Sequence, residues 1–121
     1  MRNVERCILA VEDDRYVRDL YVTLLRAEGY RVETAVDGED GLFQLRSAPD
    51  LILLDLEMPV MDGREFLRRL RQLPDHQRTP VIVITAQYGG AVLAGAQAVM
   101  PKPIDIDVLL RRISALLARP S

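Results

Sequence analysis

The residues best suited to chemistry share one position, because each stands at or just beyond the end of a short apolar run. They are three acids, one hydroxyl and one ammonium: Glu12, Asp13, Asp55, Thr85 and Lys102. If the apolar runs are parallel strands, their carboxyl ends lie at one edge of a sheet, where open α/β sheets bind ligands. We therefore expect these side chains to converge although they are far apart in the sequence.

The physics of such a cluster indicates phosphoryl chemistry. Clustered carboxylates repel one another, and their burial is costly unless a cation neutralises them. Oxygen ligands without His or Cys select a hard ion, and a few carboxylates with water and phosphate oxygens suit Mg²⁺. A carboxylate beside Mg²⁺ can attack phosphorus to give an aspartyl phosphate. Lys102 would offer a point charge and Thr85 a hydrogen bond to the transferred group.

Lys102 is also unusual in composition. The 16 basic residues comprise fifteen arginines and this single lysine. A chain that otherwise uses arginine can keep a lysine where a compact ammonium is needed and a planar guanidinium does not fit.

Five short runs predict the β-strands that position these residues. They cover residues 7–11, 31–36, 51–54, 80–85 and 98–100. The second run alternates polar and apolar residues, which is typical of a strand exposed on one face or at an edge. The third is apolar throughout, as expected of a strand buried on both faces.

Apolar residues at helical spacing predict a helix after each of the first three strands and after the last. The residues in these patterns are Val17, Leu20, Tyr21, Leu24, Leu25, Leu42, Phe43, Leu45, Phe66, Leu67, Leu70, Leu109, Ile113, Leu116 and Leu117. We interpret Asp14 as the N-cap of the first helix rather than a metal ligand, and Gly29 as its C-cap glycine. Either Asp105 or Asp107 can cap the last helix. Strand–helix alternation of this kind predicts a parallel sheet with helices on both faces and right-handed crossovers.

Composition places the chain among soluble globular proteins. Of the 121 residues, 49% are hydrophobic and 28% charged, and the formal charge is −2. This argues against disorder and against a general attraction to nucleic acid or membranes. No apolar stretch is long enough to span a bilayer, and no signal-peptide core is present, so we expect a cytoplasmic protein. Cys7 cannot form an internal disulfide and is expected to be a buried thiol. With no repeat or linker, residues 1–121 are predicted to form a single domain.

Four segments resemble the receiver domains of bacterial two-component response regulators, and together the likeness covers nearly the whole chain. They are residues 8–14 (ILAVEDD), 50–63 (DLILLDLEMPVMDG), 80–86 (PVIVITA) and the pair Lys102-Pro103. The resemblance implies an α/β fold: a doubly wound, five-stranded parallel sheet in the order 2-1-3-4-5, which is flavodoxin-like.

The resemblance also implies roles for single residues. Asp55 would be the phosphoacceptor and Asp13 a direct ligand of Mg²⁺. Glu12 would act on the metal mainly through water, and the backbone carbonyl of Glu57 would complete the protein's ligands. The set implied for the metal is Glu12, Asp13, Asp55 and Glu57.

Thr85 and Lys102 would hold the phosphoryl group, and the Lys102-Pro103 peptide would be cis. The implied function is a phosphoprotein switch in signal transduction or a phosphorelay. A sensor histidine kinase or phosphotransfer protein would supply the phosphoryl group, which is later hydrolysed, and a downstream target protein would read the result. Such a chain is not an enzyme for other substrates, since it catalyses only its own phosphorylation and dephosphorylation.

Two features depart from the family pattern. Only 17 positions separate Thr85 from Lys102, about one helical turn fewer than usual, and Gly89 and Gly90 fall where the fourth helix belongs. Adjacent glycines cost roughly 1 kcal/mol each in a helix interior, so we predict a shortened or disordered fourth helix. In addition, Val99 replaces an aromatic residue that usually moves with the threonine. We therefore expect signalling through another surface, such as that of the first helix.

Two other functions remain open. The departures favour an interaction module that keeps the receiver fold but works without phosphorylation, although the complete acidic site opposes it. A phosphatase with an aspartate nucleophile would need a second acid two residues on, which Glu57 offers superficially. The chain lacks residues for the cap or substrate pocket of such an enzyme.

Overall fold

The computed structural model describes residues 5–87 and 93–118. Five parallel strands form one sheet in the order β2-β1-β3-β4-β5, as the resemblance implied. The strands are β1 (Cys7–Val11), β2 (Arg31–Ala35), β3 (Leu51–Asp55), β4 (Val81–Thr85) and β5 (Ala98–Pro101). Every residue of β1, β3 and β4 is buried, whereas β2 lies at the edge of the sheet and is only partly buried, as predicted.

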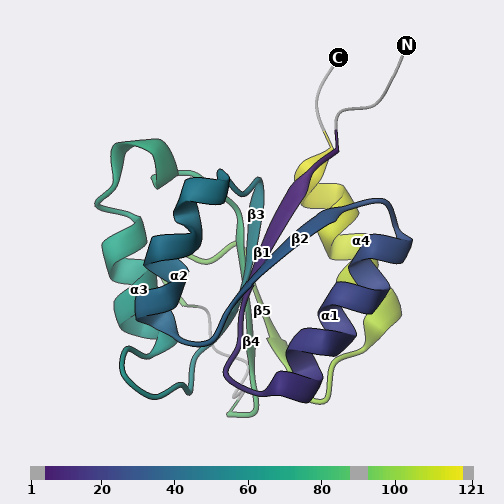
Figure 1. Ribbon diagram of the computed structural model, residues 1–121, viewed down its shortest axis with the longest axis horizontal. Coiled ribbons are helices and arrows are strands. Elements are labelled where there is room, and N and C mark those ends of the chain that lie inside the picture. Colours follow the sequence, from purple (N-terminus) through teal and green to yellow (C-terminus); the bar gives the residue numbers. More distant parts are fainter. Residues whose placement is uncertain (1–4, 88–92, 119–121) are drawn as a thin grey trace.

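The helices cover both faces of this sheet (Figure 1). They are α1 (Arg15–Ala27), α2 (Gly38–Gln44), α3 (Gly63–Leu70) and α4 (Ile106–Leu117), with short 3₁₀ turns at Leu45–Ser47 and Pro74–His76. One apolar cluster packs α1 and α4 on the sheet, and a second packs α2 and α3 on the opposite face. The fold is therefore the three-layer arrangement predicted from the strand–helix alternation.

Side-chain caps fix where the helices begin, and therefore where the loops at the edge of the sheet end. The Asp14 carboxylate accepts from the backbone N–H groups of Tyr16 and Val17, which confirms it as the N-cap of α1. Asp105, one of the two predicted candidates, caps α4 through Val108 N–H. Gly29 follows the end of α1 with φ +95°, a conformation that favours glycine.

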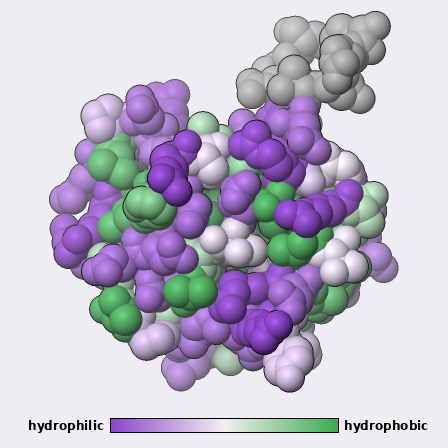
Figure 2. All heavy atoms as spheres, in the orientation of Figure 1, coloured by the Kyte–Doolittle hydropathy of each residue, from purple (hydrophilic) through white to green (hydrophobic). Residues whose placement is uncertain are grey.

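Two residues of the predicted helical patterns lie at the surface instead of the core. Leu20 of α1 and Phe43 of α2 are 44% and 56% exposed. Leu20 is exposed because the buried stripe of α1 runs through Tyr21 and Leu25 instead. The Phe43 ring carries the Arg46 guanidinium 4.0 Å above its centroid. Figure 2 shows such apolar side chains scattered among hydrophilic ones on one face.

The connection from β4 to β5 contains no helix in its described part, residues 86–87 and 93–97, which agrees with the predicted reduction of the fourth helix. The predicted Gly89-Gly90 break, with the rest of 88–92, lies outside the described residues. Arg71 secures this connection, because its guanidinium donates to the backbone carbonyls of Gly95 and Thr79. Among the described helices, none has the length and apolar character needed to cross a bilayer.

Candidate functional site

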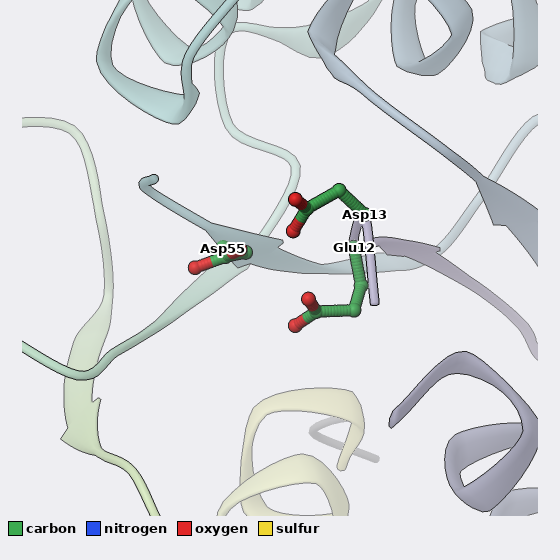
Figure 3. A group of neighbouring side chains, drawn as sticks. All are labelled: Glu12, Asp13 and Asp55. Carbon is green, nitrogen blue, oxygen red and sulfur yellow. The ribbon is translucent and has the colours of Figure 1, made fainter. Parts of the chain in front are cut away.

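Three carboxylates from two strand ends meet at one edge of the sheet. Ligand oxygens of Glu12, Asp13 and Asp55 all lie within 4.8 Å of one another. Glu12 and Asp13 follow β1, and Asp55 is the last residue of the neighbouring strand β3 (Figure 3). The structure thus places together the three acids that sequence reasoning expected to meet.

The turn from β1 to α1 is fixed from several directions. Glu12 is 1% exposed, its backbone N–H donates to the carbonyl of Ala35, and its Oε2 accepts from Asp14 N–H at 3.1 Å. Arg18 donates from Nη1 to the carbonyl oxygens of Glu12 at 2.8 Å and Asp13 at 2.9 Å. Sequence reasoning missed Arg18, because nothing in the sequence separates it from the other fourteen arginines.

The loop after β3 approaches Asp55 closely. A Cβ atom on Gly63 would lie 2.3 Å from the carbonyl oxygen of Asp55, so only glycine fits at the first position of α3. Met61 N–H donates to the carbonyl of Pro59 across Val60, whose φ is +70°, and this is the strained γ-turn geometry. The loop is therefore held tightly against the end of β3.

Thr85 and Lys102 join the site from the next two strands. Thr85 is the last residue of β4, and its carbonyl accepts from Lys102 N–H at 3.0 Å, just beyond the end of β5. Lys102 Nζ lies 3.1 Å from Glu12 Oε1 and 3.4 Å from Asp55 Oδ1. The Lys102-Pro103 peptide is cis, as the resemblance implied.

Burial makes this cluster electrostatically strained. Burial, and next the charge of Glu12, raise the pKa of Asp55 to about 7, against the opposing effect of Lys102. Burial likewise raises the pKa of Glu12 above its ordinary value. Burial alone would lower the pKa of Lys102, but the charges of Glu12 and Asp55 raise it. One ammonium therefore compensates the acids only in part.

The same residues fit a hard divalent cation. Glu12 Oε1 and Asp55 Oδ1 are buried and, within the described part of the chain, share the ammonium of Lys102 but receive no well-formed hydrogen bond. When all three carboxylates are ionised, they carry three negative charges, whereas Lys102 supplies a single positive charge. The group consists of oxygen donors alone, which is the ligand type that Mg²⁺ prefers. A bound Mg²⁺ would satisfy both the open oxygens and the excess charge.

The raised pKa of Asp55 predicts a pH dependence of stability in the metal-free protein. A carboxyl group with a folded-state pKa near 7 holds its proton where the unfolded chain, with its value near 3.8, releases it. Deprotonation of the unfolded chain therefore lowers the free energy of unfolding as the pH rises from 4 to about 7. Asp55→Asn cannot ionise, so it should gain about 1–3 kcal/mol over the wild type across this range. Urea unfolding in EDTA at several pH values measures the difference, and a pH-independent difference would contradict it.

Glu57 contributes a contact that sequence reasoning did not find. The resemblance gave a role only to its backbone carbonyl, but its side chain accepts a hydrogen bond from the Thr85 hydroxyl, at 2.9 Å to Oε1 and 3.1 Å to Oε2. These residues are 28 positions apart, and no local pattern indicates their contact. The one signal in the sequence is an acid two residues beyond Asp55, in the loop that reaches toward β4.

Comparisons with known proteins agree with this geometry. A family model for the response regulator receiver domain matches residues 8–114. Response regulator MprA of Mycobacterium leprae (strain TN) is 42% identical over 118 residues, which cover 93% of this chain and 51% of MprA. The chain thus spans about half the length of the curated relatives it matches.

Two solved structures share this fold over nearly their whole length, and one of them was solved with Mg(2+)-BeF. The Vibrio cholerae chemotaxis protein CheY4 superposes with a TM-score of 0.84 and 33% identity, over 94% of this chain and 100% of that one. Response regulator protein TrrA of Thermotoga maritima, solved in complex with Mg(2+)-BeF, superposes with a TM-score of 0.81 and 31% identity, over 93% and 99% of the two chains.

Proposed function

This chain belongs to the response regulator receiver domain family, and from that premise we propose that it is a phosphoacceptor switch whose acceptor is Asp55. The observation that carries the proposal is the meeting of Glu12, Asp13 and Asp55 around one point, with the ammonium of Lys102 beside two of them. Packing alone does not account for a cluster of acids that outnumbers the one ammonium beside it, since buried charges cost free energy unless a partner compensates them.

The proposed reaction transfers a phosphoryl group from a phosphohistidine. One carboxylate oxygen of Asp55 forms a bond to phosphorus while the bond from phosphorus to the imidazole nitrogen breaks. The bonding electron pair returns to the imidazole. Lys102 favours the ionised, nucleophilic form of Asp55, and its charge then attracts the phosphoryl oxygens.

Hydrolysis returns the switch to its starting state. Water attacks phosphorus, the bond to Asp55 breaks, and the products are inorganic phosphate, a proton and the Asp55 carboxylate. The chain would catalyse only these two steps on itself and turn over no other substrate. Thr85 can donate its hydroxyl hydrogen to the phosphoryl group in the state between the two steps.

Mg²⁺ is the cofactor that we propose, and when bound it would supply positive charge to offset the charge on the transferred group. Asp13 and Asp55 would bind it directly, Glu12 through water, and Glu57 through its backbone carbonyl. The Mg(2+)-BeF complex of the similar protein TrrA supports this choice, as does the clustering of three carboxylates around a single ammonium.

We expect Asp13→Asn to weaken Mg²⁺ affinity at least about tenfold, because affinity follows the number of charged ligands. Asp14→Asn is the matched control, since Asp14 faces the start of α1 and asparagine is an equally good N-cap. Isothermal titration calorimetry with MgCl₂ measures both. An equal loss in the two variants, or none in Asp13→Asn, would contradict the proposed ligand set.

The proposed partners are a sensor histidine kinase or phosphotransfer protein and a downstream target protein, in the cytoplasm. Exposed apolar side chains of α1 lie beside the acidic turn: Tyr16 is 84% exposed and Leu20 lies at the surface one turn later. A partner that presents a phosphohistidine to Asp55 would approach this edge of the sheet.

A second candidate is an interaction module that works without phosphorylation. It is favoured by the lack of a helix in the described residues between β4 and β5, and by the half-buried Val99, which carries no aromatic ring. Treatment with acetyl phosphate and Mg²⁺ separates the two functions. A folded wild-type protein that takes up no phosphoryl group would support the module.

A further inference from the structure

The Glu57 side chain has no part in the phosphoryl transfer derived above, yet it holds one of the groups that the transfer uses. The Thr85 hydroxyl donates to its carboxylate at 2.9 Å and 3.1 Å. Thr85 is 2% exposed and fixed at the end of β4, whereas Glu57 is an exposed loop residue. A surface acid thus reaches inward to a buried hydroxyl.

The hydrogen-bonding capacity of Thr85 limits what this hydroxyl can do. A threonine hydroxyl has a single hydrogen to donate. Its oxygen already accepts from Gln87 N–H at 3.1 Å, and its hydrogen is directed to Glu57. A phosphoryl oxygen on Asp55 can therefore receive this hydrogen only after Glu57 releases it.

Electrostatic repulsion also favours the release of Thr85 by Glu57 when a phosphoryl group is present. Two anions that share one hydroxyl lie within about 6 Å of each other, where like charges repel. A phosphoryl group on Asp55 would make the Glu57 carboxylate less favourable at its present position. Because Glu57 is exposed, water can solvate its carboxylate once it leaves Thr85.

We propose that Glu57 is a positioning residue that competes with the phosphoryl group for the Thr85 hydroxyl. In the unphosphorylated chain it keeps Thr85 turned toward the loop after β3. Phosphorylation of Asp55 displaces Glu57, and Thr85 turns to the new anion. The inference rests on the proposed function, and it concerns the balance between the two states of the switch.

Beryllofluoride, a tetrahedral phosphoryl analogue, tests the competition through its affinity for the intact chain with Mg²⁺. Glu57→Ala should bind it about 3- to 10-fold more tightly, because one hydrogen bond no longer has to break. The affinity of Glu57→Gln should lie between those of the wild type and Glu57→Ala, since its amide oxygen still accepts from Thr85 but carries no charge. Glu28→Ala removes an exposed acid just after the far end of α1 and should change affinity by less than about twofold, as expected for exposed charges separated by more than a screening length.

A double-mutant cycle shows whether Glu57 acts through Thr85. In a Thr85→Ala background the exposed Glu57 carboxylate is free to turn into water, so Glu57→Ala should change beryllofluoride affinity by less than about twofold. An equal gain in both backgrounds would overturn the inference, because Glu57 would then act on the anion directly. The inference would also be overturned if the wild type and Glu57→Ala bound beryllofluoride with the same affinity. A wild type that binds no beryllofluoride would instead overturn the proposed function itself.

The contact can be followed without any ligand. In NMR spectra of the free protein, Glu57→Ala should shift the Thr85 side-chain and Gln87 amide resonances, whereas Glu28→Ala should not. Unshifted Thr85 resonances would show that the hydrogen bond is not formed in solution, and the competition would fail even if beryllofluoride binds normally.

Discussion

Asp55→Asn is expected to abolish phosphoryl uptake from acetyl phosphate in the presence of Mg²⁺, a loss of at least about 1000-fold. An amide is not a nucleophile toward phosphorus, and Asp55 is the residue with which β3 ends. Intact-protein mass spectrometry measures the uptake, and fragmentation locates the modified residue.

The result is interpretable because this variant should fold well. Asparagine matches aspartate in size and removes one of the acids whose repulsion strains the site, so stability at neutral pH should rise. Asp75→Asn, at an exposed acid of the turn after α3, is the matched control and should be labelled like the wild type. Full labelling of Asp55→Asn, or a modified residue elsewhere in the wild type, would contradict the assignment.

Lys102→Ala should have the second largest effect, on stability as well as on labelling. Its ammonium lies beside two buried carboxylates, and its removal leaves Glu12 and Asp55 facing each other without a cation. Breaking a buried ion pair from one side costs about 3–5 kcal/mol, and we expect about 2 kcal/mol here because the lysine side chain is partly exposed. Urea unfolding in EDTA measures the loss.

Two comparisons isolate the cause of this loss. Saturating Mg²⁺ should restore much of the stability of Lys102→Ala, since a cation bound only by the folded protein stabilises it. Lys102→Arg keeps the charge and should keep more of the stability, but labelling should still fall, because a planar guanidinium does not replace a compact ammonium. An alanine variant as stable as the wild type in EDTA would contradict the electrostatic account.

Much of the site could be predicted from the sequence for a simple reason. The carboxyl ends of parallel strands share one edge, so Asp13 and Asp55 had to come close once their preceding runs were recognised as neighbouring strands. The caps at Asp14 and Asp105 follow from equally local chemistry, because an N-cap bonds to backbone groups two or three residues away.

Features that depend on side-chain orientation could not be predicted in this way. The hydrogen bond from Thr85 to Glu57 joins the end of β4 to the loop after β3, and it depends on the path that this loop takes. Arg18 is a surface residue of α1 by pattern, yet its guanidinium holds the acidic turn. Leu20 fits the helical pattern but lies beside the buried stripe, since a few tens of degrees around α1 decide its exposure.

A beryllofluoride titration with and without Mg²⁺, followed residue by residue in amide NMR spectra, tests the central claim most directly. We predict saturable binding only with Mg²⁺, and the largest shifts at residues 12–14, 55–57, 85–87 and 102. These segments are separate in the sequence, and they shift together only if the carboxylates hold a cation that contacts the same tetrahedral anion as the Lys102 ammonium. Binding without Mg²⁺, no binding, or shifts centred away from this edge of the sheet would contradict the account.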